Sequence, residues 1–546
     1  MNNFKKTFIF LNTVKYLKIS QIISRVKLQY RRITPDLASA PRISIPVNEF
    51  QTVVQSQPKM LSESRFRFLN LSSDITKAED WNLPNKDKLW LYNLHYFDDL
   101  TSLEFSQRVN WHRKSIQRWV DENPPGFGVG WEAYPSSMRI VNWIKWFLLG
   151  DNLRREWLDS LAIQARYLSN NLETHLLGNH LFANAKALMF AGIYFQGTEA
   201  DNWYQIGLKI IEKELLEQVL ADGGNFELSP MYHSIFLEDL LDIVNIHNAY
   251  NKELPKNIMK KILPMFDWMQ AMSHPDGDIS FFNDATLGIA PSLKNLLDYA
   301  KRLGIIHMGG ELNTYTHLKA SGYIRVQRDN MVSIIDTANI GADYIPGHGH
   351  ADTLSFELSL FEQRVIVNSG ISVYGNSAER QRQRGTDAHS TVVIDNQNSS
   401  EVWDGFRVAR RAQVDEISIE NREEQIKLSA CHDGYKRLKG SPKHCREWNF
   451  YKNSLVITDK IIGTGKHGVQ SILHIHPNAK LMEINNQSVN FQINKKIVNI
   501  ELQSNGKLEI VPSTYHPEFG LSIENKKIII NYNDFLPFEA IFKVSW

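Results

Sequence analysis

Four segments carry more polar side chains than their apolar surroundings require. They are HLLGNHLFANAKAL with Asn179 and His180, FELSPMYHSIFLEDLL with Glu227, Tyr232 and His233, PGHGHADTLSFELSL with His348, His350 and Asp352, and GISVYGNSAERQRQRGTDAHSTVVID with Tyr374, Arg380, Arg384 and His389. Amide, imidazole and phenol groups hold anions and move protons. Taken singly, Asn179 could equally be a helix N-cap, and Tyr232 a half-buried core residue.

Three histidines are spaced so that they could lie at one site. His348 and His350 are two residues apart, so on an extended chain their rings lie on the same face. His389 follows about forty residues later and could meet them if its strand is a neighbour. Three imidazoles at one place suit zinc, although His-x-His alone is also common among scattered polar histidines.

Helices are expected to carry the first two polar segments. From about residue 80 to 303 the apolar residues repeat at period 3.6, and loops with Gly, Pro, Asn or Asp separate the stretches. The predicted helices are Ser136–Leu149, Arg154–Leu172, His180–Phe195, Trp203–Val219, Tyr232–Tyr250 and Lys256–Met272. Periodicity leaves a bundle, a solenoid and a toroid open.

Strands are expected to carry the other two segments. After about residue 313, short β-branched runs such as MVSIIDTAN, STVVID, SLVITDKII and EAIFKVSW follow one another between turns. They predict antiparallel sheets in a sandwich. We therefore expect an N-terminal segment at 1–80, a helical domain at 81–312 and a β-sandwich at 313–546.

The amino-acid composition limits the kinds of molecule that the protein is expected to bind. The 546 residues hold 61 basic and 60 acidic side chains, a net charge of +1, which gives no reason to expect nucleic acid. Aromatic residues make up 11% and could stack on sugar rings or simply fill a core. The two cysteines, Cys431 and Cys445, could bridge neighbouring strands but do not fix a redox compartment. Homo-oligomerisation stays open.

The first residues predict an amphipathic helix. Lysines interrupt the apolar run too early for a membrane span, and no small-residue cleavage site follows. At helical period the apolar residues fall on one face, namely Leu11, Val14, Leu17, Ile22 and Val26. We expect docking on the protein ahead of peripheral contact with a membrane surface. Periplasm or cell envelope is favoured, with the cytoplasm open because no clear signal peptide is present.

Five motifs in this order resemble the heparinase II/III-like polysaccharide lyases. They are WEAYPSSMRIVNW from Trp131 to Trp143, GNHLFANAKAL, the F-x-x-S-P-x-Y-H run, GHGHADTLSF and the R-x-T-x-A-H-x-T-V-x-x-D run. The resemblance covers about residues 93–395 and implies an (α/α) toroid packed on an antiparallel β-sandwich, with the site in a cleft between them. It also implies an acidic, uronic-acid-containing polysaccharide as substrate.

The resemblance assigns roles to the polar residues. In β-elimination the uronate carboxylate is neutralised, the C5 proton is removed and the C4 oxygen is expelled and protonated. Asn179 would neutralise, Tyr232 would donate the proton or act as both acid and base, and His180 or His348 would be the base or polarise the carboxylate. The implied substrate-binding residues are Tyr374, Arg384, Tyr134 and Glu227.

The family's structural zinc would use His350, His389 and an Asp between them. The matching position here is Asn368, which lacks the charge, so zinc affinity should fall. Two other function classes remain. One is a glycoside hydrolase using carboxylates among Glu132, Glu227, Asp276 and Asp284. The other is a non-catalytic glycan-binding or assembly protein of the cell envelope.

Overall fold

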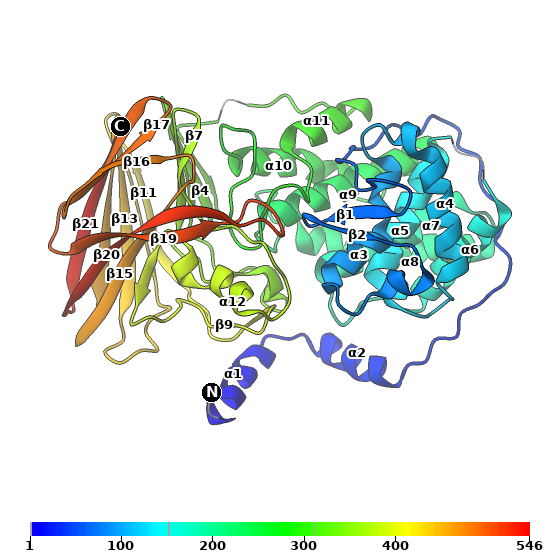
Figure 1. The fold of residues 1–546 in the computed structure, drawn as a ribbon, viewed down its shortest axis with the longest axis horizontal. Coiled ribbons are helices and arrows are strands. Elements are labelled where there is room, and N and C mark those ends of the chain that lie inside the picture. Colours follow the sequence, from blue (N-terminus) through cyan, green and yellow to red (C-terminus); the bar gives the residue numbers. More distant parts are fainter. Residues whose placement is uncertain (1–2, 151–152, 311) are drawn as a thin grey trace.

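A computed structural model describes residues 3–150, 153–310 and 312–546. Helices occupy one end of the molecule and antiparallel sheets the other, as Figure 1 shows. The predicted fold class, an (α/α) toroid followed by an antiparallel β-sandwich, is confirmed. The last helix of the helical domain ends at Arg302 and the first strand of the second domain begins at Tyr315.

The helical domain is built around tryptophan. Trp90, Trp119, Trp143, Trp157 and Trp203 are buried in one continuous apolar cluster. Its helices lie close to the predicted ranges and are α3 (Lys88–Tyr96), α4 (Val109–Glu122), α5 (Ala133–Leu148), α6 (Arg155–Ser169), α7 (Gly178–Tyr194), α8 (Thr198–Gln218), α9 (Pro230–Ala249), α10 (Ile258–Ala271) and α11 (Leu293–Arg302). Apart from Asn184 and Lys186, which are paired, α7 is apolar after its first turn, and it is buried along almost its whole length, as expected for a central helix.

Two antiparallel sheets form the second domain. The eight-stranded sheet has the order β11 (Val414–Asn421), β12 (Ile426–His432), β13 (Lys443–Tyr451), β14 (Ser454–Ile462), β21 (Phe538–Ser545), β18 (Lys496–Leu502), β17 (Ser488–Ile493) and β16 (Lys480–Ile484). The nine-stranded sheet has the order β19 (Lys507–Tyr515), β20 (Ile523–Phe535), β15 (Lys466–Ile475), β7 (Gln363–Val367), β6 (Phe356–Leu360), β5 (Met331–Asp336), β4 (Tyr323–Arg328) and β3 (Tyr315–Leu318), with β8 (Val392–Ile394) paired to β15. Alternating apolar residues from both sheets form one core.

The two domains share an apolar seam. Trp268 of α10 and Met272, directly after it, pack with Tyr323 and Ile334 of the sandwich in a small buried cluster. The Tyr323 hydroxyl donates a 2.7 Å hydrogen bond to the carbonyl of Leu228, just before α9. The start of α9 is therefore held against the sheet, and this contact brings the polar segments of both domains together.

The first 80 residues differ from the single amphipathic helix expected. Two helices, α1 (Asn3–Val14) and α2 (Ile19–Tyr30), are separated by a short break, and an extended stretch leads to the hairpin of β1 (Arg65–Phe68) and β2 (Leu71–Asp74). Figure 1 shows α1 and α2 along the lower edge of the molecule. No helix in the described ranges has both the length and the apolar content that crossing a bilayer needs.

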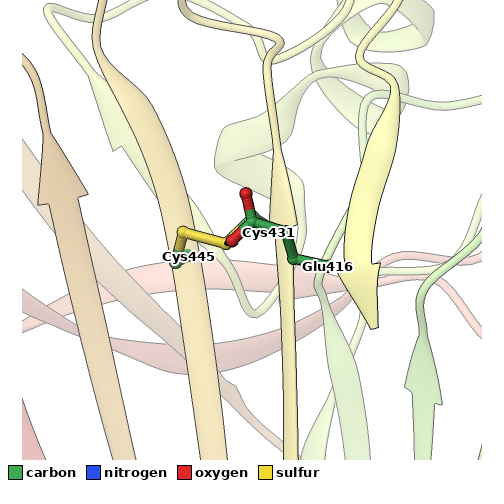
Figure 2. A group of neighbouring side chains, drawn as sticks. All are labelled: Glu416, Cys431 and Cys445. Atoms are coloured by element: carbon green, nitrogen blue, oxygen red, sulfur yellow. A yellow bond between two sulfur atoms is a disulfide. The ribbon is translucent and has the colours of Figure 1, made fainter. Parts of the chain in front are cut away.

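The predicted bridge between Cys431 and Cys445 is present. The two cysteines face each other across β12 and β13 and form a disulfide. Glu416 of β11 lies beside the disulfide, as Figure 2 shows. Its Oε2 is 3.4 Å from Cys431 Sγ. The sulfurs are bonded to each other and are not free thiolates, so this Glu–Cys–Cys group does not have the ligands of a thiolate metal site.

Candidate active site

Asn179 and His180 lie in the first turn of α7. The preceding Leu177 has a positive φ of 68°, and this turn of the chain directs the exposed end of the buried helix toward the sandwich. Unpaired N–H groups and the helix dipole make such an end attractive to anions. Both side chains are half-buried, in contrast to the rest of α7. The Asn179 amide and the His180 imidazole therefore lie where the start of α7 reaches solvent.

Tyr232 lies in the first turn of α9. Ser229 caps this helix, its hydroxyl accepting a hydrogen bond from the Tyr232 N–H, and Pro230 takes the position that needs no N–H donor. The Tyr232 hydroxyl is 2.9 Å from that of Tyr374, which comes from the sandwich. Burial first, and then Tyr374, raises the pKa of Tyr232 well above its usual value. Tyr232 therefore keeps its proton until a reaction draws it away.

His348 packs its ring against that of Tyr232, and a hydrogen bond to Asp284 on its other side fixes the orientation of the ring. The two ring centroids are 3.9 Å apart, and His348 follows Pro346 in the short helical turn η5 (Pro346–His348). Its Nδ1 lies 2.8 Å from Oδ2 of Asp284. A carboxylate can only accept, so Nδ1 carries a proton, and the neutral form of this imidazole has its lone pair on Nε2.

Asp284 joins the two domains at this point. Its other oxygen, Oδ1, accepts from His350 Nε2 at 2.8 Å, and both oxygens accept from Arg380, with Nη2 2.7 Å from Oδ2. Burial alone would raise the pKa of Asp284, but Arg380, His348 and His350 together outweigh it and hold the pKa well below its usual value. Asp284 is therefore a permanent carboxylate that orients two histidines.

Glu227 is a second buried carboxyl beside the proton-transfer groups. Its Oε1 accepts from the Asn179 backbone N–H at 3.3 Å, and its Oε2 is 3.5 Å from His348 Nε2. Burial raises the pKa of Glu227, and His348 partly offsets that rise. Glu227 therefore connects the start of α7 to His348.

His180 is paired with an acid that the sequence reasoning missed. Its Nδ1 lies 3.1 Å from Oε1 of Glu173, and its ring is 4.5 Å from that of Tyr134, centroid to centroid. Burial alone would lower the pKa of His180, but Glu173 outweighs it and raises the pKa above its usual value. The signal that could have found Glu173 is a lone carboxylate seven residues before His180 in an otherwise polar loop.

Arg384 does not sit where a substrate-binding residue was expected. Its side chain is fully buried and donates to the backbone carbonyls of Gly349 and Gly405. It therefore holds the loop that carries His348 and His350. Arg380, one helical turn earlier, reaches Asp284, and the sequence reasoning gave it no role.

Two of the three expected metal ligands, His350 and His389, lie together, and the third, Asn368, is a weak ligand. His350 Nδ1 and His389 Nε2 are 3.3 Å apart, a separation that two nitrogens at about 2.0–2.1 Å from one tetrahedral zinc would have. Asn368 Oδ1 accepts from the Ser390 N–H at 3.2 Å, so the neutral amide is already hydrogen-bonded. Two imidazoles and one amide fit a low-affinity structural ion better than a tight one.

Two family models match consecutive parts of the chain. The heparinase II/III N-terminus matches residues 101–303, and the heparinase II/III-like C-terminal model matches residues 311–541. The first covers most of the helical domain and the second nearly all of the sandwich. Together they take in every candidate site residue discussed above.

Two characterised proteins are similar in sequence to this chain. The chain is 27% identical to a heparin-sulfate lyase of Bacteroides stercoris over 316 residues, which is 54% of this chain and 45% of that protein. It is 27% identical to a heparin-sulfate lyase of Pedobacter heparinus over 368 residues, 60% of this chain and 55% of that one. The chain thus matches about half the length of these relatives.

The crystal structure of heparinase III superimposes with a TM-score of 0.73 at 17% identity, covering 95% of this chain and 88% of that one. At this identity the likeness shows the fold, in which a helical toroid is joined to a β-sandwich. Matched by both family models in the order in which they occur, the chain belongs to the heparinase II/III-like family.

Proposed function

We propose that the protein is a polysaccharide lyase that cleaves a uronic-acid-containing glycan by β-elimination, leaving a 4,5-unsaturated uronate end. The observation that carries the proposal is the meeting of Tyr232 with His348 and Tyr374 across the domain seam, beside Asn179. These are an amide, a base and a phenol, which are the groups that the elimination needs. The heparin-sulfate lyases that match half of their length to this chain support the same class.

Asn179 and His180 suit the carboxylate of the substrate. The C5 proton is not acidic until the neighbouring carboxylate is neutralised. The Asn179 amide can donate a hydrogen bond to it, and the raised pKa of His180 favours an imidazolium there. Both groups stand at the start of α7, where the helix dipole also favours an anion.

His348 and Tyr232 suit the two proton transfers. Nε2 of His348 takes the C5 proton, because its Nδ1 is committed to Asp284. The electron pair of that C–H bond forms the C4–C5 double bond, and the C4–O bond breaks. Tyr232, which keeps its proton in the resting site, gives it to the leaving oxygen. Proton exchange with solvent then restores both groups.

The glycoside hydrolase alternative has less support from the carboxylates. Glu132 is paired with Tyr92 and Lys88, and Asp276 accepts two hydrogen bonds from Arg364. Asp284 is held ionised by Arg380 and does not serve as an acid. Of these four candidate acids, Glu227 is the one that faces the site without an arginine or lysine partner among the described residues.

The decisive experiment compares a native uronate polymer with the same polymer after its carboxyl groups are reduced to hydroxymethyl groups. A lyase shortens the native polymer, produces the ultraviolet absorbance of an unsaturated uronate and leaves the reduced polymer intact. A hydrolase shortens both without that absorbance. Shortening of the reduced polymer would therefore refute the proposal, and binding without cleavage across a panel of uronate glycans would favour a non-catalytic role.

Asn179→Ala is the matched variant. Loss of the amide should reduce kcat/KM on the native polymer by about 10²–10³-fold, because a charge-assisted hydrogen bond in the transition state is lost. Asn170→Ala, on the exposed end of α6, is a control with the same substitution. Activity of Asn179→Ala close to that of the control would remove the neutralising role.

Two further assignments accompany the proposal. A zinc ion held by His350, His389 and Asn368 would be structural, ordering the loop beside His348, since elimination needs no metal-activated water. The Cys431–Cys445 disulfide supports work in an oxidising compartment such as the periplasm or cell envelope. Thiol titration of protein taken directly from each cell fraction tests this placement, and a fully reduced pair would contradict it.

A further inference from the structure

The two helices at the lower edge of the molecule are docked by their polar side. Gln21 of α2 is completely buried and donates to the carbonyls of Leu176 and Tyr344. Lys18 pairs with Glu217 and lies 3.6 Å from the centroid of the Tyr344 ring. These contacts fix α2 on the helical domain and on the loop of the sandwich that carries Tyr344, through polar and charged groups.

Helix α1 is attached to the sandwich in a similar way. Thr13 accepts a 3.0 Å hydrogen bond from the indole of Trp403, and the Arg411 guanidinium lies 3.8 Å from the ring centroid of Tyr16. The pair α1–α2 therefore spans both domains, which fits its course along the lower edge in Figure 1.

The apolar side of α2 is left exposed. Ile19, Ile22, Ile23, Val26 and Tyr30 follow the spacing i, i+3, i+4, i+7 and i+11, so they share one face. Ile19 is 75% exposed and Ile23 is 49% exposed, whereas Gln21 on the opposite face is fully buried. A surface helix that covers a protein core has the reverse arrangement. An apolar face turned to solvent indicates a second surface to which it binds.

Charge identifies that surface. Residues 1–35 contain eight Lys and Arg and no Asp or Glu, while the other 511 residues hold 53 basic and 60 acidic side chains. Lys27, Arg31 and Arg32 are exposed beside the apolar face. An apolar face bordered by basic residues is the pattern of a helix that lies in the interface of an anionic bilayer. A soluble acidic glycan would attract the charges but would leave the isoleucines without a partner.

We propose that α1 and α2 dock the protein on an anionic membrane surface through the exposed face of α2. The contacts of Gln21 lie three residues before Asn179 and four before His348, in the two loops that carry those residues. Docking therefore holds the candidate site next to the bilayer, where a polymer attached to or emerging from the membrane would reach it. The docking itself does not depend on the proposed lyase activity.

The test is cosedimentation of the full chain with vesicles. Vesicles of phosphatidylcholine with phosphatidylglycerol should bind the protein, and vesicles of phosphatidylcholine alone should bind it far more weakly. Lys27→Gln with Arg31→Gln and Arg32→Gln should lower the partition coefficient by about 100-fold, and added salt should weaken wild-type binding. Ile19→Ser with Ile23→Ser should lower it at least about tenfold.

The matched control is Ile484→Ser with Ile497→Ser, two similarly exposed isoleucines on the sandwich, which should bind as wild type does. All variants should keep the wild-type melting temperature and act normally on soluble polymer. No binding to anionic vesicles would overturn the proposal, as would full binding by the Ile19/Ile23 variant. If the protein does not bind vesicles, two further measurements identify what the surface binds instead. Retention on immobilised heparin that depends on the basic residues would indicate an acidic glycan. A dimer that the Ile19/Ile23 variant dissociates would indicate a second copy of the chain.

Discussion

At the scale of single residues, the site works by fixing which group carries a proton. Asp284 holds Nδ1–H of His348, which leaves Nε2 as the acceptor, and burial with Tyr374 keeps Tyr232 protonated. The acid and the base are thus assigned before a substrate arrives, with their rings stacked on each other. Such assignment by environment is how one site performs both proton transfers at one pH.

Tyr232→Phe should lower kcat by about 10²–10⁴-fold with little change in KM, because the proton donor is lost while the ring still stacks on His348. Initial rates from the absorbance of the unsaturated product give both constants. Tyr204→Phe is the control, since its hydroxyl faces His247 elsewhere in the helical domain. A Tyr232→Phe enzyme with near-normal kcat would exclude this hydroxyl from the chemistry.

The His180–Glu173 pair predicts a pH dependence of KM. Glu173 raises the pKa of His180, and His180 lowers that of Glu173, so each residue favours the charged form of the other. As pH rises through the His180 pKa, above about 6.5, the positive charge is lost and KM for an acidic polymer should rise. His180→Gln should have a higher KM that is flat over this window, and His317→Gln on β3 should keep the wild-type profile. A flat wild-type profile would contradict the assignment.

At the scale of elements, the loops after β5 and β7 determine whether a metal is held. Asn368 directly follows β7, and its Oδ1 accepts from the N–H of Ser390, the neighbour of His389. His350 precedes β6, and its ring nitrogen lies 3.3 Å from that of His389. Asn368→Asp should raise the zinc content of protein purified without chelator, because a carboxylate replaces a neutral amide. Without zinc the same variant should melt at a lower temperature than wild type, since it buries an unpaired charge, and added zinc should restore it.

Elemental analysis and melting curves measure both effects. Asn368→Asp with His389→Gln is the control and should respond to zinc no more than wild type does. A zinc content that stays unchanged in Asn368→Asp would leave the two histidines as ordinary polar packing.

Elements with a strong period were predictable, and long-range polar partners were not. The predicted helix Arg154–Leu172 is α6, and SLVITDKII is β14, because one buried face imposes its spacing on the sequence. The motifs also brought out Asn179, Tyr232 and His348. The pairing of Asp284 with Arg380 joins residues 96 apart in the chain, and neither periodicity nor local spacing reports such a contact. The split of the first helix was missed because the apolar residues continue at helical period across the break between α1 and α2.

At the scale of the whole molecule, the site exists only where the two domains meet. The helical domain supplies Asn179 and Tyr232, and the sandwich supplies His348 and Tyr374. Asp284, in the loop between α10 and α11, accepts hydrogen bonds from three side chains of the second domain. One buried carboxylate therefore both orients His348 and adds to the contacts that hold the two domains together.

Asp284→Asn tests that dependence. The amide cannot accept from His348, His350 and Arg380 at once, and it leaves the buried Arg380 without its counter-ion. Removing one partner of a buried ion pair costs about 3–5 kcal/mol, so the variant should melt earlier. It should also lose activity at temperatures where it is fully folded, because Nδ1 of His348 is no longer held. Far-ultraviolet circular dichroism fixes that temperature, and rates are compared there.

Asp276→Asn is the matched control, because Asp276 also accepts from a sandwich arginine, Arg364, but has no contact with a site histidine among the described residues. It should lose some stability and keep its kcat. If both variants lose stability and both keep kcat, Asp284 only fastens the domains together, and the orientation of His348 comes from its stacking on Tyr232. If Asp284→Asn alone loses kcat while folded, the same carboxylate joins the domains and prepares the base, and the composite site explains why both halves of the fold are needed.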